Sequence, residues 1–272
     1  MKLRVSFINF LNSVPLGWGF LHGEQRENFE LSFDVPSECA RRLATGAADV
    51  GLIPVIEYQR IPGLRVLPEM SISAKREVKS VLFVSQKPLD EIQTVALDTS
   101  SRTSVALLRV ILEIFHQRVG LTYQSQPPLP ETMLANCDAA LIIGNPALHL
   151  QTSGLRVYDL AHEWAKFTGL PFVFAFWAVA DGVVLGANLN TFYQSKEAGL
   201  AAIKEIADNY SNSLGLDPYD TREYLQRHLD YSLDEANLKG LNMFYELARR
   251  LDLIPAIQPV KFYPVAAGEG RF

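Results

Sequence analysis

The side chains best suited to chemistry lie in one short turn, residues 98–104, between a predicted strand and a predicted helix. Ser100 or Ser101 can cap that helix, and a cap needs only one hydroxyl. Three more polar side chains follow: Arg102, Thr103 and Ser104. Together with the free backbone N–H groups of a helix start, they suit a carboxylate or a phosphate. A hydroxyl-rich cap on a solvated turn is the alternative interpretation.

A second polar turn, Asn12 and Ser13, interrupts an apolar segment between another strand and helix. Asn12 would either bind a ligand hydroxyl or form an Asx turn before the helix, and the residues alone favour the turn. Further positions face the same expected cleft: Ile53, Pro54, residues 71–73, Ser80, Gly144, Asn145 and Pro146. Such a cleft is expected because ligands of open α/β sheets bind beyond the carboxyl ends of the strands.

No motif in the sequence points to a cofactor or a metal. The five histidines are scattered without metal-ligand spacing, and the chain has no nucleophile elbow, no dinucleotide fingerprint and no Walker loop. Cys39 and Cys137 have no CxxC partner, so we expect two core thiols. The sequence therefore predicts no metal and no cofactor, and it disfavours α/β-hydrolase and NAD chemistry.

Length and composition suit two globular lobes. The 272 residues are 48% hydrophobic and 20% charged, which is ample for a core and long for a single one. Thirty acidic residues against 25 basic ones give a net charge of −5, the wrong sign for a nucleic-acid partner. The longest apolar stretch, residues 170–180, is far shorter than the roughly 20 residues of a membrane span. We expect neither nucleic acid nor membrane as a partner.

The first residues bear on export. Residues 1–4 have the charge of a signal-peptide start, but polar residues break the apolar run that follows, and no small-x-small cleavage site comes after it. The sequence therefore predicts a cytoplasmic location. It carries no indication of oligomeric state.

Strands and helices alternate over the first two thirds of the chain, which predicts α/β layers with mostly parallel sheets. The expected strands are residues 2–9, 29–35 and 49–53, and the first expected helix covers residues 15–22. A second helix is expected from an N-cap at Ser37 to a glycine stop at Gly46.

A weak internal repeat predicts two similar lobes. Residues 36–54 and 130–144 share one plan, in which a proline and a short helix lead to an aspartate before an apolar strand. Two generic βαβ units would have the same pattern. The two aspartates, Asp49 and Asp138, are expected to be structural because each precedes a buried strand.

Long uninterrupted strands predict where the lobes meet. Residues 79–85 are expected to close the first lobe and residues 172–180 to return to it, so the first lobe is residues 1–85 and 175–272 and the second is residues 86–174. The C-terminal third predicts three packing helices, which begin at Asn190, at Asp220 and at a capping box of Ser232 and Glu235.

Six segments in order resemble the chorismate dehydratase family. The most specific are SSRTSV and TGLPFVFAFW, and the likeness spans roughly residues 3–180. The six segments are residues 9–16, 49–54, 78–82, 95–105, 138–144 and 168–177. The resemblance implies a type II periplasmic-binding-protein fold, with two α/β lobes around a ligand cleft.

The resemblance also implies an activity and its residues. A member of this family is a carbon–oxygen lyase that converts chorismate to 3-[(1-carboxyvinyl)oxy]benzoate and water on the futalosine route to menaquinone, without cofactor or metal. Asn12 and Ser80 match its catalytic positions. The implied substrate-binding residues are Ser13, Ile53, Pro54, Ser100, Arg102, Thr103, Ser104, Gly144 and Asn145. The family usually has aspartate where this chain has Asn145, so that position carries no ionisable carboxylate here.

Two other functions stay open at this point. One is the sister dihydroxynaphthoate synthase of the same pathway, against which residues 101–105 argue. The other is a non-catalytic solute-binding protein for an aromatic or sulfonate-like anion, which an export signal would favour. The sequence reveals no protein base, and a carboxylate of the substrate is one candidate for that role.

Overall fold

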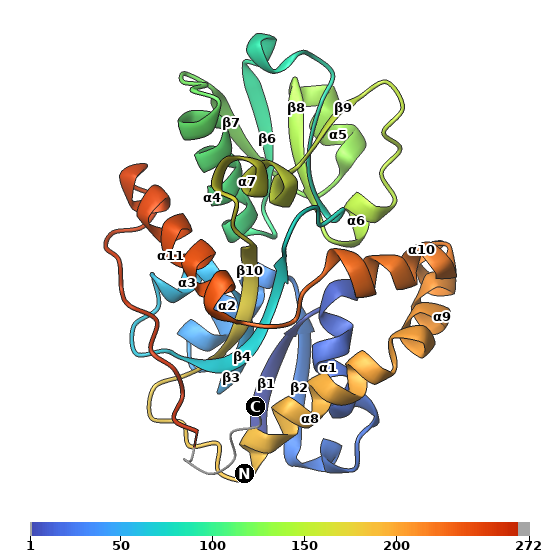
Figure 1. The fold of residues 1–272 in the computed structure, drawn as a ribbon, viewed down its shortest axis with the longest axis vertical. Coiled ribbons are helices and arrows are strands. Elements are labelled where there is room, and N and C mark those ends of the chain that lie inside the picture. The colour runs from blue at the N-terminus through green and yellow to red at the C-terminus, as the bar shows by residue number, and fades with distance from the viewer. Residues whose placement is uncertain (1, 266–272) are drawn as a thin grey trace.

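Two five-stranded sheets, one in each lobe, form the framework of the computed structural model, which describes residues 2–265 (Figure 1). The first sheet has the order β2-β1-β3-β10-β4 and the second the order β7-β6-β8-β5-β9. The first sheet contains β1 (Leu3–Ile8), β2 (Phe29–Asp34), β3 (Val50–Pro54), β4 (Arg65–Ala74) and β10 (Phe172–Val179). The second contains β5 (Val81–Ser85), β6 (Thr94–Asp98), β7 (Thr122–Gln126), β8 (Ala139–Ile143) and β9 (Arg156–Asp159).

The two sheets share one plan. In the first, β1 runs parallel to β2 and β3, while β10 is antiparallel to β3 and β4. In the second, β6 runs parallel to β7 and β8, while β5 is antiparallel to β8 and β9. The predicted α/β class with two similar lobes is confirmed. The expectation of mostly parallel sheets is wrong, because half of the strand pairings in each sheet are antiparallel.

The two repeated aspartates do the same structural work in the two lobes. Asp49 Oδ2 accepts from the backbone N–H of Arg4 at 2.8 Å, and Asp138 Oδ2 accepts from those of Gln93 and Thr94 at 2.8 and 3.0 Å. Each carboxylate thus secures the start of the neighbouring strand. Hydrogen bonds lower the pKa of both groups, chiefly from the Arg4 side chain at Asp49 and from Lys87 at Asp138.

The expected lobe boundaries differ from the structure. The strand Val81–Ser85, expected to close the first lobe, pairs with β8 and β9 in the second sheet. All of β10 lies in the first sheet, although residues 172–174 were expected in the second lobe. The chain therefore crosses at residues 75–80 and returns at residues 169–171. An apolar strand does not encode which sheet it joins, because that choice depends on partners distant in sequence.

Helices cover the sheets of both lobes (Figure 1). In the first part of the chain these are α1 (Val14–His22), α2 (Pro36–Ala44), α3 (Val55–Tyr58), α4 (Arg102–Arg109), α5 (Pro130–Asn136), α6 (Asn145–Leu148) and α7 (Leu160–Thr168). The C-terminal part has α8 (Asn188–Ala201), α9 (Ile203–Leu214), α10 (Pro218–Glu223) and α11 (Glu235–Arg250). Short 3-10 turns are η1 (Leu11–Ser13), η2 (Glu24–Asn28) and η3 (Leu89–Glu91), and π-helical turns are η4 (Val110–Phe115) and η5 (Tyr224–His228). None of the helices in residues 2–265 is long and apolar enough to cross a membrane.

Several predicted helix starts are wrong by a few residues. Ser37 is the second residue of α2, which begins at Pro36. Asp217, not Asp220, caps α10, because its carboxylate accepts the first free N–H groups. Asp234, not Ser232, caps α11 through a 2.9 Å hydrogen bond from the Asn237 N–H. At α10 and α11 a neighbouring aspartate caps the helix in place of the expected residue. At α2 no side chain caps the helix, and Pro36 in its first turn has no N–H group to satisfy.

The helix expected from Asn190 through Tyr210 is two helices, α8 and α9, which meet at Ala202. Helix α8 packs very closely on α1. A Cβ at Gly199 would lie 1.9 Å from the Pro15 carbonyl oxygen, so only glycine allows this approach. The contact fixes the turn before α1, which carries Asn12.

Candidate active site

A narrow cavity lies between the two lobes and receives residues from both sheets. Its volume is about 40 Å³, which is room for about three water molecules at the roughly 10–15 Å³ that each requires. The apolar lining residues include Phe10, Ile72, Ile143 and Phe174, and the polar ones are Asn12, Ser80, Ser101, Thr103 and Ser104. The cavity is thus small, mainly apolar, and polar only at a few points.

Ser80 lies in a constrained turn just before β5, not inside the predicted strand. Its side chain is fully buried, and its Oγ accepts from the Tyr224 hydroxyl at 2.8 Å. The preceding residue, Lys79, has a φ of +60°, which is uncommon for a side-chain-bearing residue. The carboxylate of Asp159 stabilises this turn by accepting from the N–H groups of Val78 and Lys79 at 2.9 and 2.6 Å.

Asn12 and Ser13 are neighbours with different surroundings. Asn12, in the turn η1, lines the cavity, and its Oδ1 is buried without a hydrogen-bond partner among the described residues. The Ser13 hydroxyl instead donates to the carbonyls of Ile8 and Phe10. Asn12 therefore presents a free acceptor to the cleft, whereas Ser13 stabilises the turn.

The N-terminus of α4 supplies the other polar side of the cavity. Ser101 caps the helix by accepting from the Ser104 N–H at 3.2 Å, and its hydroxyl donates to Ser104 Oγ at 2.9 Å. Thr103 Oγ1 accepts from the Ile56 N–H of the opposite lobe at 3.2 Å. Since Thr103 and Ser104 act as acceptors in these bonds, each keeps its own hydroxyl hydrogen for an anion. The positive end of the helix dipole favours the same ligand.

The structure separates the predicted binding residues into two groups. Those that line the cavity are Asn12, Pro54, Ser80, Thr103, Ser104 and Gly144. Those that do not are Ser13, Ile53, Ser100, Arg102 and Asn145. As ligand contacts, both groups stay predictions.

Besides Ser13, three residues of the second group have hydrogen-bond or ion-pair partners within the protein. Ser100 donates to Asp98 Oδ1 at 2.5 Å, and Arg102 pairs with Glu57 of the first lobe at 2.7 Å. Asn145 Oδ1 accepts from the N–H of Leu11 at 3.0 Å, and this bond also joins the lobes. Their role in the structure is to shape the cleft and hold it closed.

Sequence reasoning missed several lining residues and one buried partner. Phe174 lies in one of the quoted segments, but its direction was not predictable from the pattern. Phe10 is apolar and carried no chemical signal, whereas Ile72 belongs to residues 71–73, which were expected to face the cleft, and it lines the cavity. Tyr224 reaches Ser80 from 144 positions further along the chain, in a segment that was expected only to pack.

The cavity contains no ionisable side chain among its lining residues. The nearest buried carboxylate in the α4 turn is Asp98, whose Oδ2 has no hydrogen-bond partner among residues 2–265. Burial raises the pKa of Asp98, and the hydrogen bonds from Ser100 only partly offset this. No group of three or more potential metal ligands occurs in the described part of the chain. The site thus offers dipoles and hydroxyl groups rather than charges.

This fold and cleft are those of a periplasmic-binding-protein-like protein. Solved structures of similar fold include protein AF1704 of Archaeoglobus fulgidus, with a TM-score of 0.74 and 17% identity over 93% of this chain and 98% of that one. The alkanesulfonate-binding protein of Xanthomonas axonopodis has a TM-score of 0.63 and 15% identity over 94% of both chains. A Candida albicans protein described as having the generic periplasmic binding protein fold has a TM-score of 0.58 and 11% identity over 98% of this chain and 99% of that one. The predicted fold is confirmed.

The chain belongs to the menaquinone biosynthesis family, whose sequence profile matches residues 3–250. A chorismate dehydratase of Thermus thermophilus is 29% identical over 269 residues, which cover 92% of this chain and 96% of that protein. A chorismate dehydratase of Campylobacter jejuni is 27% identical over 258 residues, covering 92% and 98%. The resemblance predicted from the sequence is confirmed over nearly the whole chain.

Proposed function

We propose that this protein is a chorismate dehydratase, a hydro-lyase that forms 3-[(1-carboxyvinyl)oxy]benzoate and water from chorismate. The observation that carries the proposal is the small cleft between the lobes, with hydroxyl groups and a helix N-terminus on one side and Asn12 with Ser80 on the other. The similarity to two chorismate dehydratases over 92% of the chain supports the same reaction. We assign the reaction to the cytoplasm and to the futalosine route.

The chemistry requires little from the protein because the product ring is aromatic. The ring hydrogen on the carbon that bears the enolpyruvyl ether is acidified through conjugation with the ring carboxylate. Loss of that proton sends the C–H electron pair into the ring, the neighbouring C–O bond breaks, and the departing hydroxide takes up a proton as water. The enzyme must hold the reactive conformation, stabilise the developing charge and assist the leaving group.

The polar groups of the cleft match these requirements. The hydroxyl groups of Thr103 and Ser104 and the N-terminus of α4 are suited to one carboxylate of chorismate. Asn12 Oδ1, which is buried and unpartnered, is suited to accept a hydrogen bond from the ring hydroxyl. Ser80 lines the same cavity and is suited to donate to that hydroxyl as it leaves.

The base is best assigned to the substrate. None of the lining residues within the described part of the chain is a carboxylate, an imidazole or an amine, so residues 2–265 place no basic side chain in the cavity to remove the ring proton. A carboxylate of chorismate becomes more basic when the closed cleft removes it from water. We therefore assign the proton transfer to a substrate carboxylate.

Substrate access requires the lobes to part. The cavity of about 40 Å³ is much smaller than the roughly 300 Å³ or more of a typical small-molecule site. Only two segments, residues 75–80 and 169–171, connect the sheets, and they are the natural hinge. Closure around chorismate would then exclude water.

The test is to add chorismate to the purified protein after chelator treatment and to follow the ultraviolet spectrum and the product mass. Loss of the mass of one water, with a new benzoate-type absorbance, is expected. Saturable binding without turnover would contradict the proposal and favour a solute-binding protein. Turnover of a cyclised dehypoxanthine futalosine, but not of chorismate, would indicate the sister synthase.

A further inference from the structure

We propose that Tyr224 is a positioning residue for this reaction, which orients the hydroxyl group of Ser80 toward the leaving hydroxyl. The inference rests on the proposed function and extends it to the C-terminal third of the chain. Tyr224 begins the π-helical turn η5 and is 4% exposed. Its hydroxyl lies 2.8 Å from Ser80 Oγ.

The direction of the Tyr224–Ser80 hydrogen bond determines where the serine hydrogen points. Burial raises the pKa of Tyr224 above its usual range, so the phenol stays protonated and acts as the donor. A serine hydroxyl that accepts this bond keeps its own hydrogen for another acceptor. Ser80 lines the cavity, and a hydroxyl that leaves from the ring would be that acceptor.

Asn12 supplies the complementary group in the same cavity. Its Oδ1 is buried and has no hydrogen-bond partner among the described residues, and its side chain lies near enough to the phenol to offset part of the rise in the pKa of Tyr224. The cavity thus presents a free acceptor on Asn12 and a free donor on Ser80. A ring hydroxyl can donate to the first and accept from the second.

This arrangement helps the C–O bond to break. Negative charge develops on the departing oxygen, and the Ser80 hydroxyl would donate to it. A hydroxyl that itself accepts a hydrogen bond is a stronger donor, because successive hydrogen bonds polarise one another. Tyr224 therefore acts through Ser80, because it does not itself line the cavity.

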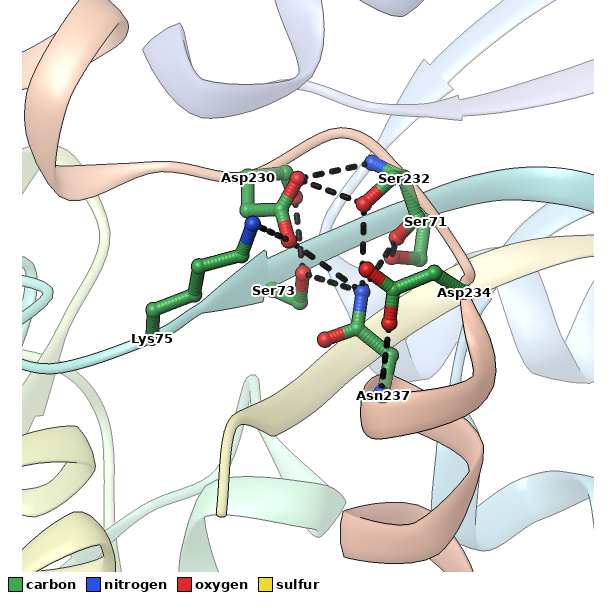
Figure 2. Close-up of polar contacts among 7 residues, drawn as sticks. All are labelled: Ser71, Ser73, Lys75, Asp230, Ser232, Asp234 and Asn237. Carbon is green, nitrogen blue, oxygen red and sulfur yellow. Dashed lines mark hydrogen bonds and ion pairs between the residues drawn. The ribbon is translucent and has the colours of Figure 1, made fainter. Parts of the chain in front are cut away.

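The fold holds Tyr224 firmly against the segment that carries Ser80. After η5 the chain runs antiparallel to β4, where the backbone N–H groups of Asp230 and Ser73 donate to each other's carbonyls at 2.8 and 2.9 Å. Figure 2 shows the polar cluster around this contact, in which Asn237 of α11 donates to the Ser232 carbonyl at 2.8 Å. Strand β4 leads directly into residues 75–80. The cluster therefore joins the strand before Ser80 to the loop after Tyr224.

Removal of the Tyr224 hydroxyl group tests the inference, and Tyr231 provides a matched control. Tyr231 is also buried, at 5% exposure, and its hydroxyl has no hydrogen-bond partner among residues 2–265. Tyr224→Phe should lower kcat about 10- to 100-fold, with KM changed less than about threefold. Tyr231→Phe should leave both constants at the wild-type values.

A double-mutant cycle separates positioning from a general loss of structure. Chorismate turnover and melting temperature are measured for wild type, Tyr224→Phe, Ser80→Ala and the double variant. Because Tyr224 acts mainly through Ser80, its substitution should cost clearly less in the Ser80→Ala background than in wild type. All variants should melt cooperatively, since the Phe substitution only removes a hydroxyl.

Any other outcome would contradict either the positioning role of Tyr224 or the proposed function. Equal turnover of Tyr224→Phe and Tyr231→Phe overturns the inference, and so does an equal loss in both backgrounds of the cycle. If wild-type protein forms no product from chorismate, the proposed function fails, and the positioning role falls with it. The wild-type assay alone identifies that case, so the two failures are distinguishable.

Discussion

The carboxylate of Glu57 and the guanidinium of Arg102 form an ion pair across the cleft, with Oε2 and Nη1 2.7 Å apart. Glu57 is almost completely buried, at 3% side-chain exposure, whereas Arg102 is 48% exposed. The other oxygen of Glu57 pairs with Arg60 of its own lobe at 2.6 Å. The Glu57–Arg102 ion pair therefore joins the lobes when the cleft is closed. When the lobes separate, Glu57 keeps Arg60 as its partner.

We expect Arg102→Ala to weaken closure more than chemistry. A half-exposed ion pair contributes up to about 1 kcal/mol, so KM should rise up to about fivefold while kcat changes little. Arg102→Lys keeps the charge and should lie between wild type and the alanine variant. Steady-state kinetics and small-angle scattering of the free protein would measure both effects. A fall in kcat with unchanged KM would place Arg102 in the chemical step instead.

Ser80→Ala should lower kcat about 100-fold and change KM only slightly, because the hydrogen bond that Ser80 donates strengthens as charge develops on the leaving oxygen. Asn12→Ala should have an effect of about the same size, because the ring hydroxyl loses the acceptor that fixes its orientation. Ser85→Ala is the matched control, since Ser85 is a buried serine at the far end of β5 whose hydroxyl bonds to backbone. Initial rates over a range of chorismate concentrations give both constants. A pure rise in KM would reduce Asn12 and Ser80 to binding residues.

Thr103→Val should weaken substrate binding, because it removes the hydroxyl that faces the cleft and leaves the Ile56 N–H without its acceptor. We expect KM to rise about tenfold, the effect of about 1.4 kcal/mol. Thr103→Ser keeps the hydroxyl and should retain most of the affinity. Calorimetric binding of the reaction product would confirm the change independently of turnover. Equal affinity of the two variants would exclude Thr103 from the carboxylate site.

Gly144→Ala should destabilise the protein and disturb the cleft. Gly144 has a φ of +66°, and a Cβ there would lie 2.8 Å from the Phe10 ring, which lines the cavity. Gly154 is the control, because it has a φ of +78° but open space around its Cβ position. Gly154→Ala should cost only the backbone strain of about 1–2 kcal/mol, and Gly144→Ala clearly more. Chemical denaturation of both variants measures the difference in the free energy of unfolding. An equal loss in the two variants would mean that the Phe10 ring moves aside freely.

Asp98→Asn should change how stability depends on pH. Burial raises the pKa of Asp98 in the folded state, so its stabilising contribution is full below the unfolded pKa of about 3.9 and is lost as pH rises through the folded value. The free energy of unfolding of wild type, minus that of the variant, should therefore fall as pH increases above about 4. Urea denaturation between acidic and neutral pH gives this difference. A difference that rises with pH would mean that the folded protein stabilises the ionised carboxylate.

The sequence predicted a strand or a helix start well where a single local pattern of residues determines that element. Alternating and apolar runs identified β1, β2, β3 and β10, and the hydroxyl-rich turn identified the start of α4. Ser101 is its cap, one of the two serines expected. These features depend on residues close together in the chain, whose hydrogen bonding and burial are set by side-chain type and period. A few short segments of specific sequence were sufficient to identify the family.

Only the tertiary structure decided which distant groups meet. It placed Val81–Ser85 in the second sheet, turned Arg102 toward Glu57, and brought Tyr224 to Ser80 across 144 positions. Such contacts depend on how two lobes and a C-terminal segment pack against one another, and no local period encodes that packing. The sequence by itself therefore determined the elements, the fold class and the family, while the folded chain determined which hydroxyl and amide groups remain free to act in the cleft.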